Sequence, residues 1–334
     1  MKARYLPLAV AISAAAMTTS VMAEGPVDGK VYGKINVSLE SADVAGSKSR
    51  ETSIVNNSSR LGFKGATKLD EQNGLTVTYQ LEFEVSPDEG DLGGKSNYSA
   101  TDSSGDTVTI KNVNDHNTIK QRNSFVGLKG SFGEARVGIH DSAFKNAQGN
   151  VDQFNDLKGD LKHLFNGENR LKNTVYYLSP KFSGLSFDLS YATPEATDND
   201  QISAAVKFEL DGLYAALAYD NDVTSKGVHY EAYRAAASYK IEALTVGAMF
   251  QQEDTAKDSE NGFLVSAAYK IDAATVKAQY GQSDIKAQGK NQWSLGADYK
   301  LGKPTKVFAF YTMDDQDAAN KDNNYVGLGL EHKF

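Results

Sequence analysis

The end of the chain constrains the fold more than any other segment. From residue 326 to 333 apolar residues alternate with small or polar ones, with His332 on the apolar face and Glu331 and Lys333 on the opposite face, and the chain stops at Phe334. This period of two is typical of a strand with one apolar face. An open sheet edge cannot lie in lipid, so such a strand must pair with the first one. The pattern predicts a closed membrane β-barrel, with Phe334 as its assembly signal.

The beginning of the chain agrees with export. Lys2 and Arg4 precede an apolar stretch over 6–17, and small or apolar residues follow up to Ala23. This pattern predicts a secretory signal peptide over 1–23, followed by one barrel domain over 24–334. Its removal deletes two basic residues and no acidic ones, so the formal charge changes from −8 to −10. The absence of cysteine excludes a disulfide framework and a thiolate metal site.

The hydropathy of the chain leaves two interpretations open. After the signal segment no apolar run approaches the roughly 18 residues of a membrane-spanning helix, and the mean hydropathy is −0.46. Both a soluble secreted β protein and a barrel in which every second residue meets lipid fit these values. The order of residues decides between them.

Aromatic residues recur at close to 30 residues in the C-terminal half. One series precedes short turns, and a second follows it after 11 or 12 residues: Phe208, Tyr239, Tyr269 and Tyr299, then Tyr219, Phe250, Tyr280 and Tyr311. Each unit therefore reads as strand, tight turn, strand and polar loop. Aromatic residues at both ends of an apolar face are typical of the two interfacial girdles of a membrane barrel. A soluble sandwich gives no reason for this rhythm.

The same rule predicts 16 antiparallel strands. They are expected at 30–40, 58–68, 75–86, 117–129, 134–140, 172–182, 185–192, 200–210, 213–220, 229–240, 244–252, 260–270, 274–281, 291–301, 305–313 and 322–334. Hairpin signals at Asn73-Gly74, Ser183-Gly184 and Asp211-Gly212 mark short turns, expected on the periplasmic side. Sixteen strands leave a lumen too wide for side chains to fill, so an aqueous channel is expected.

Two long segments interrupt the rhythm. Residues 87–116 are rich in Ser, Asp, Gly and Asn and are expected to form an exposed loop. Residues 141–171 contain apolar side chains such as Phe144, Phe154 and Leu161. A loop of this length with its own apolar residues usually packs on a surface, and the surface that a barrel offers is its inner wall.

Several motifs, in order along the mature chain, resemble the Gram-negative general diffusion porins and their neisserial-type branch. They are the segments 31–34 (VYGK), 58–65 (SSRLGFKG), 122–130 (RNSFVGLKG) and 173–185 (NTVYYLSPKFSGL), together with the terminal Phe334. The resemblance implies a homotrimer of 16-stranded barrels in which the loop over 141–171 folds inward and narrows the pore.

The resemblance further implies a basic wall facing acidic loop residues. The wall residues would be Lys34, Arg60, Arg122 and Arg170. Alternation independently places Lys34, Arg60 and Lys64 inside, because a charge facing the lipid midplane would cost ~2–4 kcal/mol. Ile139 stands where many relatives carry a further wall arginine.

The acidic partners are expected among Asp152, Asp156 and Asp160, which lie four residues apart. In a short helix they would share one face aimed at the basic wall; the alternative is a solvated face of the loop. Balanced bases and acids predict weak charge selectivity that leans toward anions.

No catalytic residue, metal or cofactor is expected, and the expected partners are outer-membrane lipid, lipopolysaccharide, small hydrophilic solutes and ions, without nucleic acid. Three other functions are open alternatives: a hydrolase, a channel selective for oligosaccharides or phosphate, and an adhesin. A hydrolase would need a Ser–His or Asp–His arrangement, and no histidine lies in such a motif. A sugar-selective channel would use an aromatic slide, for which Phe308 and Phe310 are candidates, and a phosphate channel would need a more basic loop. An adhesin would use the exposed loops.

Overall fold

The computed structural model describes residues 28–70, 74–88, 94–101, 107–115, 119–193, 200–225, 228–255, 258–316 and 322–334. The predicted signal peptide lies outside these residues. None of the helices in the described part of the chain is long and apolar enough to cross a membrane.

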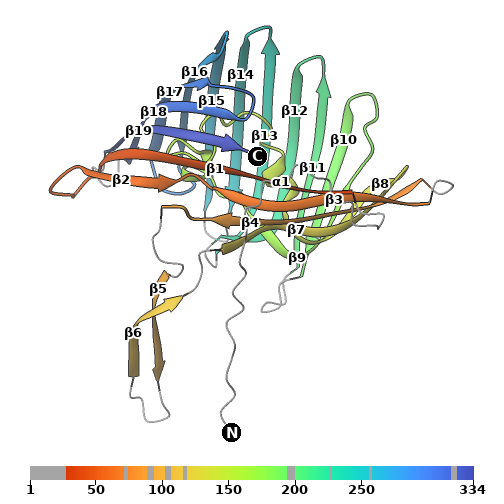
Figure 1. Ribbon diagram of the computed structural model, residues 1–334, viewed down its shortest axis with the longest axis horizontal. Helices are drawn as coiled ribbons and strands as arrows, with labels where there is room; N and C mark the ends of the chain where they lie inside the picture. Colours follow the sequence, from red (N-terminus) through yellow and green to blue (C-terminus); the bar gives the residue numbers. More distant parts are fainter. Residues whose placement is uncertain are drawn as a thin grey trace, which may run out of the picture.

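Antiparallel strands form a closed barrel, as predicted (Figure 1). The strands of the barrel are β1 (Asp28–Asp43), β2 (Glu51–Asn56), β3 (Arg60–Asp70), β4 (Leu75–Val85), β7 (Ile119–Gly130), β8 (Gly133–Asp141), β9 (Arg170–Leu178), β10 (Leu185–Ala192), β11 (Gln201–Leu210), β12 (Leu213–Ser225), β13 (Val228–Ile241), β14 (Leu244–Asp254), β15 (Ser259–Ile271), β16 (Ala274–Ser283), β17 (Lys290–Lys300), β18 (Thr305–Gln316) and β19 (Asn323–Lys333). Because β2 and β3 pair with successive halves of β1, they occupy one strand position, and the barrel has the predicted 16.

The two ends of the chain close the barrel. β1 pairs with β19 from Lys34 opposite Lys333 to Asp43 opposite Asn324. Phe334 extends this pairing, since its backbone N–H donates to the Gly33 carbonyl at 3.1 Å and the Gly33 N–H donates back at 3.0 Å. A Cβ on Gly33 would lie 2.6 Å from the Phe334 ring and 2.5 Å from the Arg60 carbonyl, so glycine makes room at the closure.

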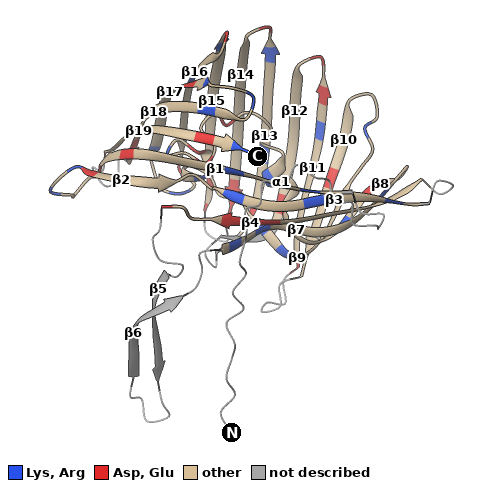
Figure 2. Ribbon diagram, viewed as in Figure 1, with Lys and Arg blue, Asp and Glu red and all other residues tan. Residues whose placement is uncertain are grey.

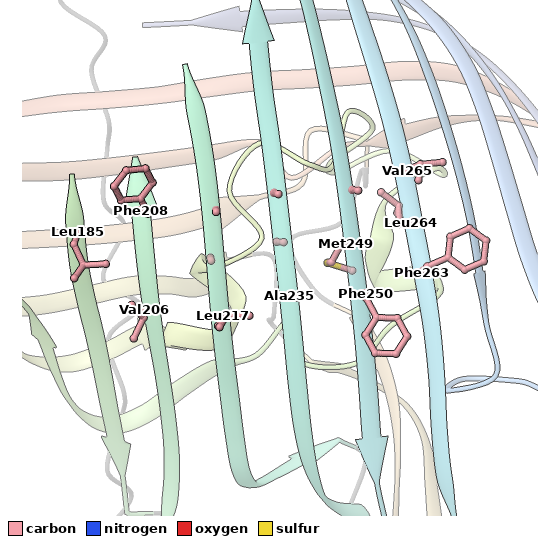
Figure 3. Close-up of a pocket in the computed structure, with 15 residues that line it drawn as sticks. Leu185, Val206, Phe208, Leu217, Ala235, Met249, Phe250, Phe263, Leu264 and Val265 are labelled. Carbon is pink, nitrogen blue, oxygen red and sulfur yellow. The ribbon is translucent and has the colours of Figure 1, made fainter. Parts of the chain in front are cut away.

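The outer face of the barrel is apolar. Along β10–β15, side chains such as Leu217, Phe250 and Val265 point outward and surround an apolar hollow floored by alanines (Figure 3). Leu217, for example, is 68% exposed on this outer face. The side chains between the outward-facing ones point inward, and on β10 these are polar, as Ser186, Asp188 and Ser190 show. This alternation is what a strand between lipid and a lumen requires.

Two segments differ from the prediction. Residues 51–56, expected as loop, form β2, which pairs with the second half of β1. Their polar side chains do not show the alternation by which a strand is recognised in a sequence. A positive φ of 54° at Ser58 separates β2 from β3. The expected loop over 87–116 contains a hairpin, β5 (Gly94–Thr101) and β6 (Thr107–Asp115).

The short turns have the expected chemistry. Ser183 and Gly184 have φ values of 50° and 90°, and Asp211 and Gly212 have 47° and 83°. Two successive positive φ angles match the right-handed twist of a two-residue hairpin. Asn73 lies outside the described residues.

Residues 142–169, called the inner loop below, fold into the barrel as predicted. They contain α1 (Ala143–Asn146) and the short 3-10 helix η1 (Leu161–His163). Their apolar side chains are buried in three clusters with inward-facing residues of the wall: Phe144 with Tyr176 and alanines of β10–β13, Leu161, Leu164 and Phe165 with Met249 and Leu264, and Phe154 and Leu157 with Phe308 and Phe310. The inner loop is therefore a packed element that covers the lumen side of β10–β18.

Candidate functional site

The start of the inner loop is fixed by small polar residues of the wall. The backbone N–H groups of Ala143 and Phe144 donate to the hydroxyl oxygens of Ser190 and Ser203, at 3.3 and 2.8 Å. These N–H groups belong to the first turn of α1 and have no acceptor within the helix. The wall thus satisfies them and sets where the loop begins.

Arg234 on β13 joins both ends of the inner loop. Its fully buried guanidinium donates to the carbonyls of Phe144 and Asn166 at 3.3 and 3.2 Å. It also pairs with Glu168 at 3.0 Å, donates twice to Gln251, and lies 4.2 Å from the centre of the Phe144 ring. A planar fork of donors suits this convergence of acceptors. Sequence reasoning missed Arg234, although alternation with the outward-facing aromatic Tyr233 places it on the lumen side.

Asp156 is where the inner loop reaches the opposite wall. Its φ of 69° turns the chain toward β1 and β3. One carboxylate oxygen accepts from Lys34 Nζ at 2.8 Å and from Arg60 at 3.0 Å. Burial raises the pKa of Asp156, but Lys34 and Arg60 outweigh it and hold that pKa below its ordinary value of 3.8. Two wall bases and one loop acid therefore meet at one point.

The basic wall carries its own carboxylates, which sequence reasoning missed. Arg122 donates to Glu82 at 2.7 Å and to Glu84 at 2.8 Å. Lys34 has a second acidic neighbour, Glu331, at 3.6 Å. Figure 2 shows acidic stretches of β4 beside basic stretches of β3. These carboxylates could have been predicted from the sequence, because alternation places Glu82 and Glu84 together on the inward face of β4.

An irregular stretch of β7 brings Arg122 and the next residue to the same region. The register between β4 and β7 shifts between Leu81 and Phe83, opposite this stretch. Asn123 contacts Asp141 at 3.1 Å and accepts from Arg170 at 2.9 Å, while Arg170 also pairs with Asp141 at 3.0 Å. Strict alternation would have sent one of Arg122 and Asn123 to the lipid side.

Lys64 lies apart from this group. Its ammonium lies 4.4 Å from the centre of the Tyr32 ring, whose hydroxyl donates to Glu82 at 2.9 Å. Lys64 thus makes a cation–π contact, and Tyr32 separates it from the point where Asp156 meets the wall.

Asp152 and Asp160 do not join Asp156 in an acidic stripe. The segment is not helical before η1, so residues four apart do not share a face. Asp152 accepts from the backbone N–H groups of Phe154 and Leu161 at 2.8 and 3.1 Å. Asp160 accepts from the backbone of Asp156 and Lys162, each at 2.8 Å. These two carboxylates hold the loop's own backbone, and the expectation of a helical stripe is wrong.

Phe308 and Phe310 point inward but do not form a slide along the pore. They are 3% and 4% exposed and pack beneath Phe154 and Leu157. Gly327 and Gly329 on β19 leave the space that the two rings fill. The rings are part of the base on which the inner loop rests.

On β8 a different arginine reaches the lumen. Arg136 donates to Glu134 at 2.8 Å and contacts Nε2 of His140 at 2.8 Å. Nδ1 of His140 lies 2.7 Å from the Asp141 carbonyl, so both ring nitrogens are engaged within the protein. Within the described residues, no three His, Cys, Asp or Glu side chains are placed to hold a metal ion.

An apolar outer face, a polar lumen and a loop that narrows it are the features of a membrane channel formed by a β-barrel. A family model described as Gram-negative porin matches residues 8–319. The chain belongs to the Gram-negative porin family and is an outer-membrane porin.

The relatives and solved structures agree with this membership. The chain is 28% identical over 271 residues to the major outer membrane protein P.IB of Neisseria meningitidis serogroup B, covering 75% of this chain and 72% of that protein. It is 27% identical over 273 residues to the P.IB protein of Neisseria gonorrhoeae, covering 73% and 70%. The fold is similar to the anion-selective porin from Comamonas acidovorans (TM-score 0.69, 20% identity, 92% and 100% covered) and to OmpF of Salmonella typhi in complex with daunomycin (TM-score 0.69, 17% identity, 92% and 98% covered).

Proposed function

We propose that small hydrophilic solutes and ions cross this porin by passive diffusion through a constriction between the inner loop and the wall formed by β1, β3, β4 and β7. The observation that carries the proposal is the contact of Asp156 with Lys34 and Arg60, which joins the inner loop to this wall and places charged groups beside the lumen. Charges fixed across a narrow passage create a transverse field that orders water and polar solutes.

The constriction is nearly balanced in charge. Each of the wall bases Lys34, Arg60, Arg122 and Arg170 has a carboxylate within 4 Å. Pairs of this kind cancel most of each other's field at a distance, so the charge selectivity is weak. The leaning toward anions stays a prediction, and the carboxylates of Glu82 and Glu84 reduce the basic surplus on which it depends.

We also propose that the protein is a homotrimer that contacts outer-membrane lipid and lipopolysaccharide. The relatives' family, and the apolar outer face that any such assembly must cover, support this. Native mass spectrometry of the detergent-extracted protein tests the trimer, and a monomeric mass with full channel activity would contradict it.

Single-channel recording in planar bilayers tests the function. The purified protein should give stepwise openings in KCl with weak selectivity. Absence of any conductance from protein that is folded by circular dichroism would contradict the diffusion channel.

A further inference from the structure

We propose that the inner loop carries a binding subsite for neutral, hydroxyl-rich solutes of about disaccharide size, next to the constriction. This inference rests on the proposed function, because it assumes that solutes enter the lumen. The subsite is a cavity of about 490 Å³ bounded by residues 148–155 of the inner loop and by Thr245 at the start of β14. A volume in this range is typical of small-molecule sites.

The lining of this cavity is chemically distinct from the charged wall. Gln148, Asn150, Gln153 and Asn155 contribute four side-chain amides, and Thr245 adds a hydroxyl. The lining also includes Asp152, whose two carboxyl oxygens already accept from backbone N–H groups of the loop. An amide presents both donors and an acceptor, which matches the hydroxyl group of a sugar. No lysine or arginine is among the described residues that line the cavity, so it lacks the charge-assisted donors that would favour an anion.

Two of the loop amides are free to hydrogen-bond a solute, whereas the charged groups of the wall are already paired. The side chains of Asn150 and Asn155 are exposed and make no intramolecular hydrogen bond to any described residue. Arg60 and Arg122, in contrast, already hold carboxylates at 3.0 and 2.7 Å. A solute can therefore hydrogen-bond the loop amides directly, whereas it would have to break ion pairs to bind the arginines of the wall.

The backbone behind the amides is held in place. Gln153 donates from its backbone N–H to Gln279 of β16 at 2.8 Å and from its side chain to the Asn150 carbonyl at 2.7 Å. Asp152 fixes the backbone of Phe154 at 2.8 Å. A site that is ordered before binding loses less entropy when a solute enters. Weak, reversible binding of this kind is compatible with permeation.

Sucrose tests the subsite, with a polyethylene glycol of equal hydrodynamic radius as the control solute, because its repeating ethers accept hydrogen bonds but do not donate them. The measurement is the interruption of KCl current through the full-length mature protein in planar bilayers. Sucrose should interrupt the current with saturable kinetics, and the polymer should only lower it in proportion to concentration. The double variant Asn150→Ala/Asn155→Ala should weaken the apparent affinity about tenfold, with unchanged open-channel conductance.

Two further variants separate an effect of the cavity from a general effect on the channel. Asn261→Ala removes an exposed amide of β15 away from the cavity and should leave sucrose binding unchanged. Thr245→Val changes the opposite side of the cavity and should weaken sucrose binding without touching the loop. Saturation that none of the cavity variants alters, or sucrose and polymer that behave alike, would overturn the subsite while the channel stands. Loss of all KCl conductance in the unmodified protein would overturn both.

Discussion

The inner loop meets the barrel along two edges of different kind. Toward β10–β18 it buries aromatic and aliphatic side chains and the guanidinium of Arg234. Toward β1 and β3 its Asp156 contacts Lys34 and Arg60 beside the open lumen. Apolar burial and the fully buried Arg234 contribute more to stability than an ion pair that is only partly buried beside the lumen. The first edge should therefore fix the position of the loop, and the second should set the field in the passage.

Arg234→Ala should have the largest effect. It removes the donors to Phe144 and Asn166 and leaves Glu168 buried without its partner. Breaking a buried ion pair by removing one partner costs about 3–5 kcal/mol. Urea unfolding in detergent should show this loss, and the released loop should raise the single-channel conductance.

Arg234→Lys is the matched control, since it keeps the charge but not the planar fork. It should fall between the wild type and Arg234→Ala in both measurements. Equal conductance in all three proteins would show that Arg234 does not position the loop.

Phe154→Ala should act on the same edge more weakly. The ring is buried against Phe308 and Phe310, and its loss should destabilise the protein by about 3 kcal/mol, the lower end for such a truncation, because lumen water can enter the space. Thermal unfolding measures the loss. Asn155→Ala, the truncation of an exposed neighbour, should change the unfolding temperature little, and similar shifts for both would contradict the assigned packing.

Asp156→Asn should change selectivity and spare stability. The substitution leaves Lys34 and Arg60 without their shared carboxylate, so the passage becomes more favourable to anions. A change of about twofold to fivefold in the chloride-to-potassium permeability ratio corresponds to about 0.4–1 kcal/mol. Reversal potentials under a KCl gradient give the ratio. A ratio equal to that of the wild type would place the constriction elsewhere.

The interior of the inner loop and its contact with β1 and β3 should also respond to pH in opposite directions. Burial, together with the nearby Asp160, raises the pKa of Asp152 to about 8. Its contribution to the stability of the folded inner loop is therefore complete below the ordinary value of 3.8 and is lost as the pH rises through about 8. The pKa of Asp156 is lowered, so its contact with Lys34 and Arg60 persists from neutral pH down to below 3.8.

Conductance recorded from pH 6 to pH 10 tests this difference. It should change through about pH 8 in the wild type and stay level in Asp152→Asn, which cannot ionise. An equal alkaline change in both proteins would assign it to another group.

The sequence predicted the barrel well because a strand between lipid and water must alternate. Lys34 and Arg60 followed from that rule, and the inward fold of the loop followed from apolar residues such as Phe144 and Phe154. Glu82 and Glu84 obey the same alternation, yet only the structure shows which bases they neutralise.

The rest depended on local irregularities and long-range contacts. The irregular β7 stretch at Arg122 and Asn123 breaks the period of two, and no pattern of residues in the sequence predicts it. The acidic stripe required a helix that the loop does not form, because Asp152 and Asp160 bind backbone N–H groups within the loop. Arg234 acquires its role from residues about 70 to 90 positions away in the chain.

The most direct test of the central claim is the reversal potential of Arg60→Ala/Arg122→Ala beside that of Asp156→Asn, each under the same KCl gradient. If the passage runs beside the contact of Asp156 with this wall, the two potentials should move in opposite directions, toward cations for the loss of bases and toward anions for the loss of the acid. Shifts of the same sign, or none from either variant, would contradict the account.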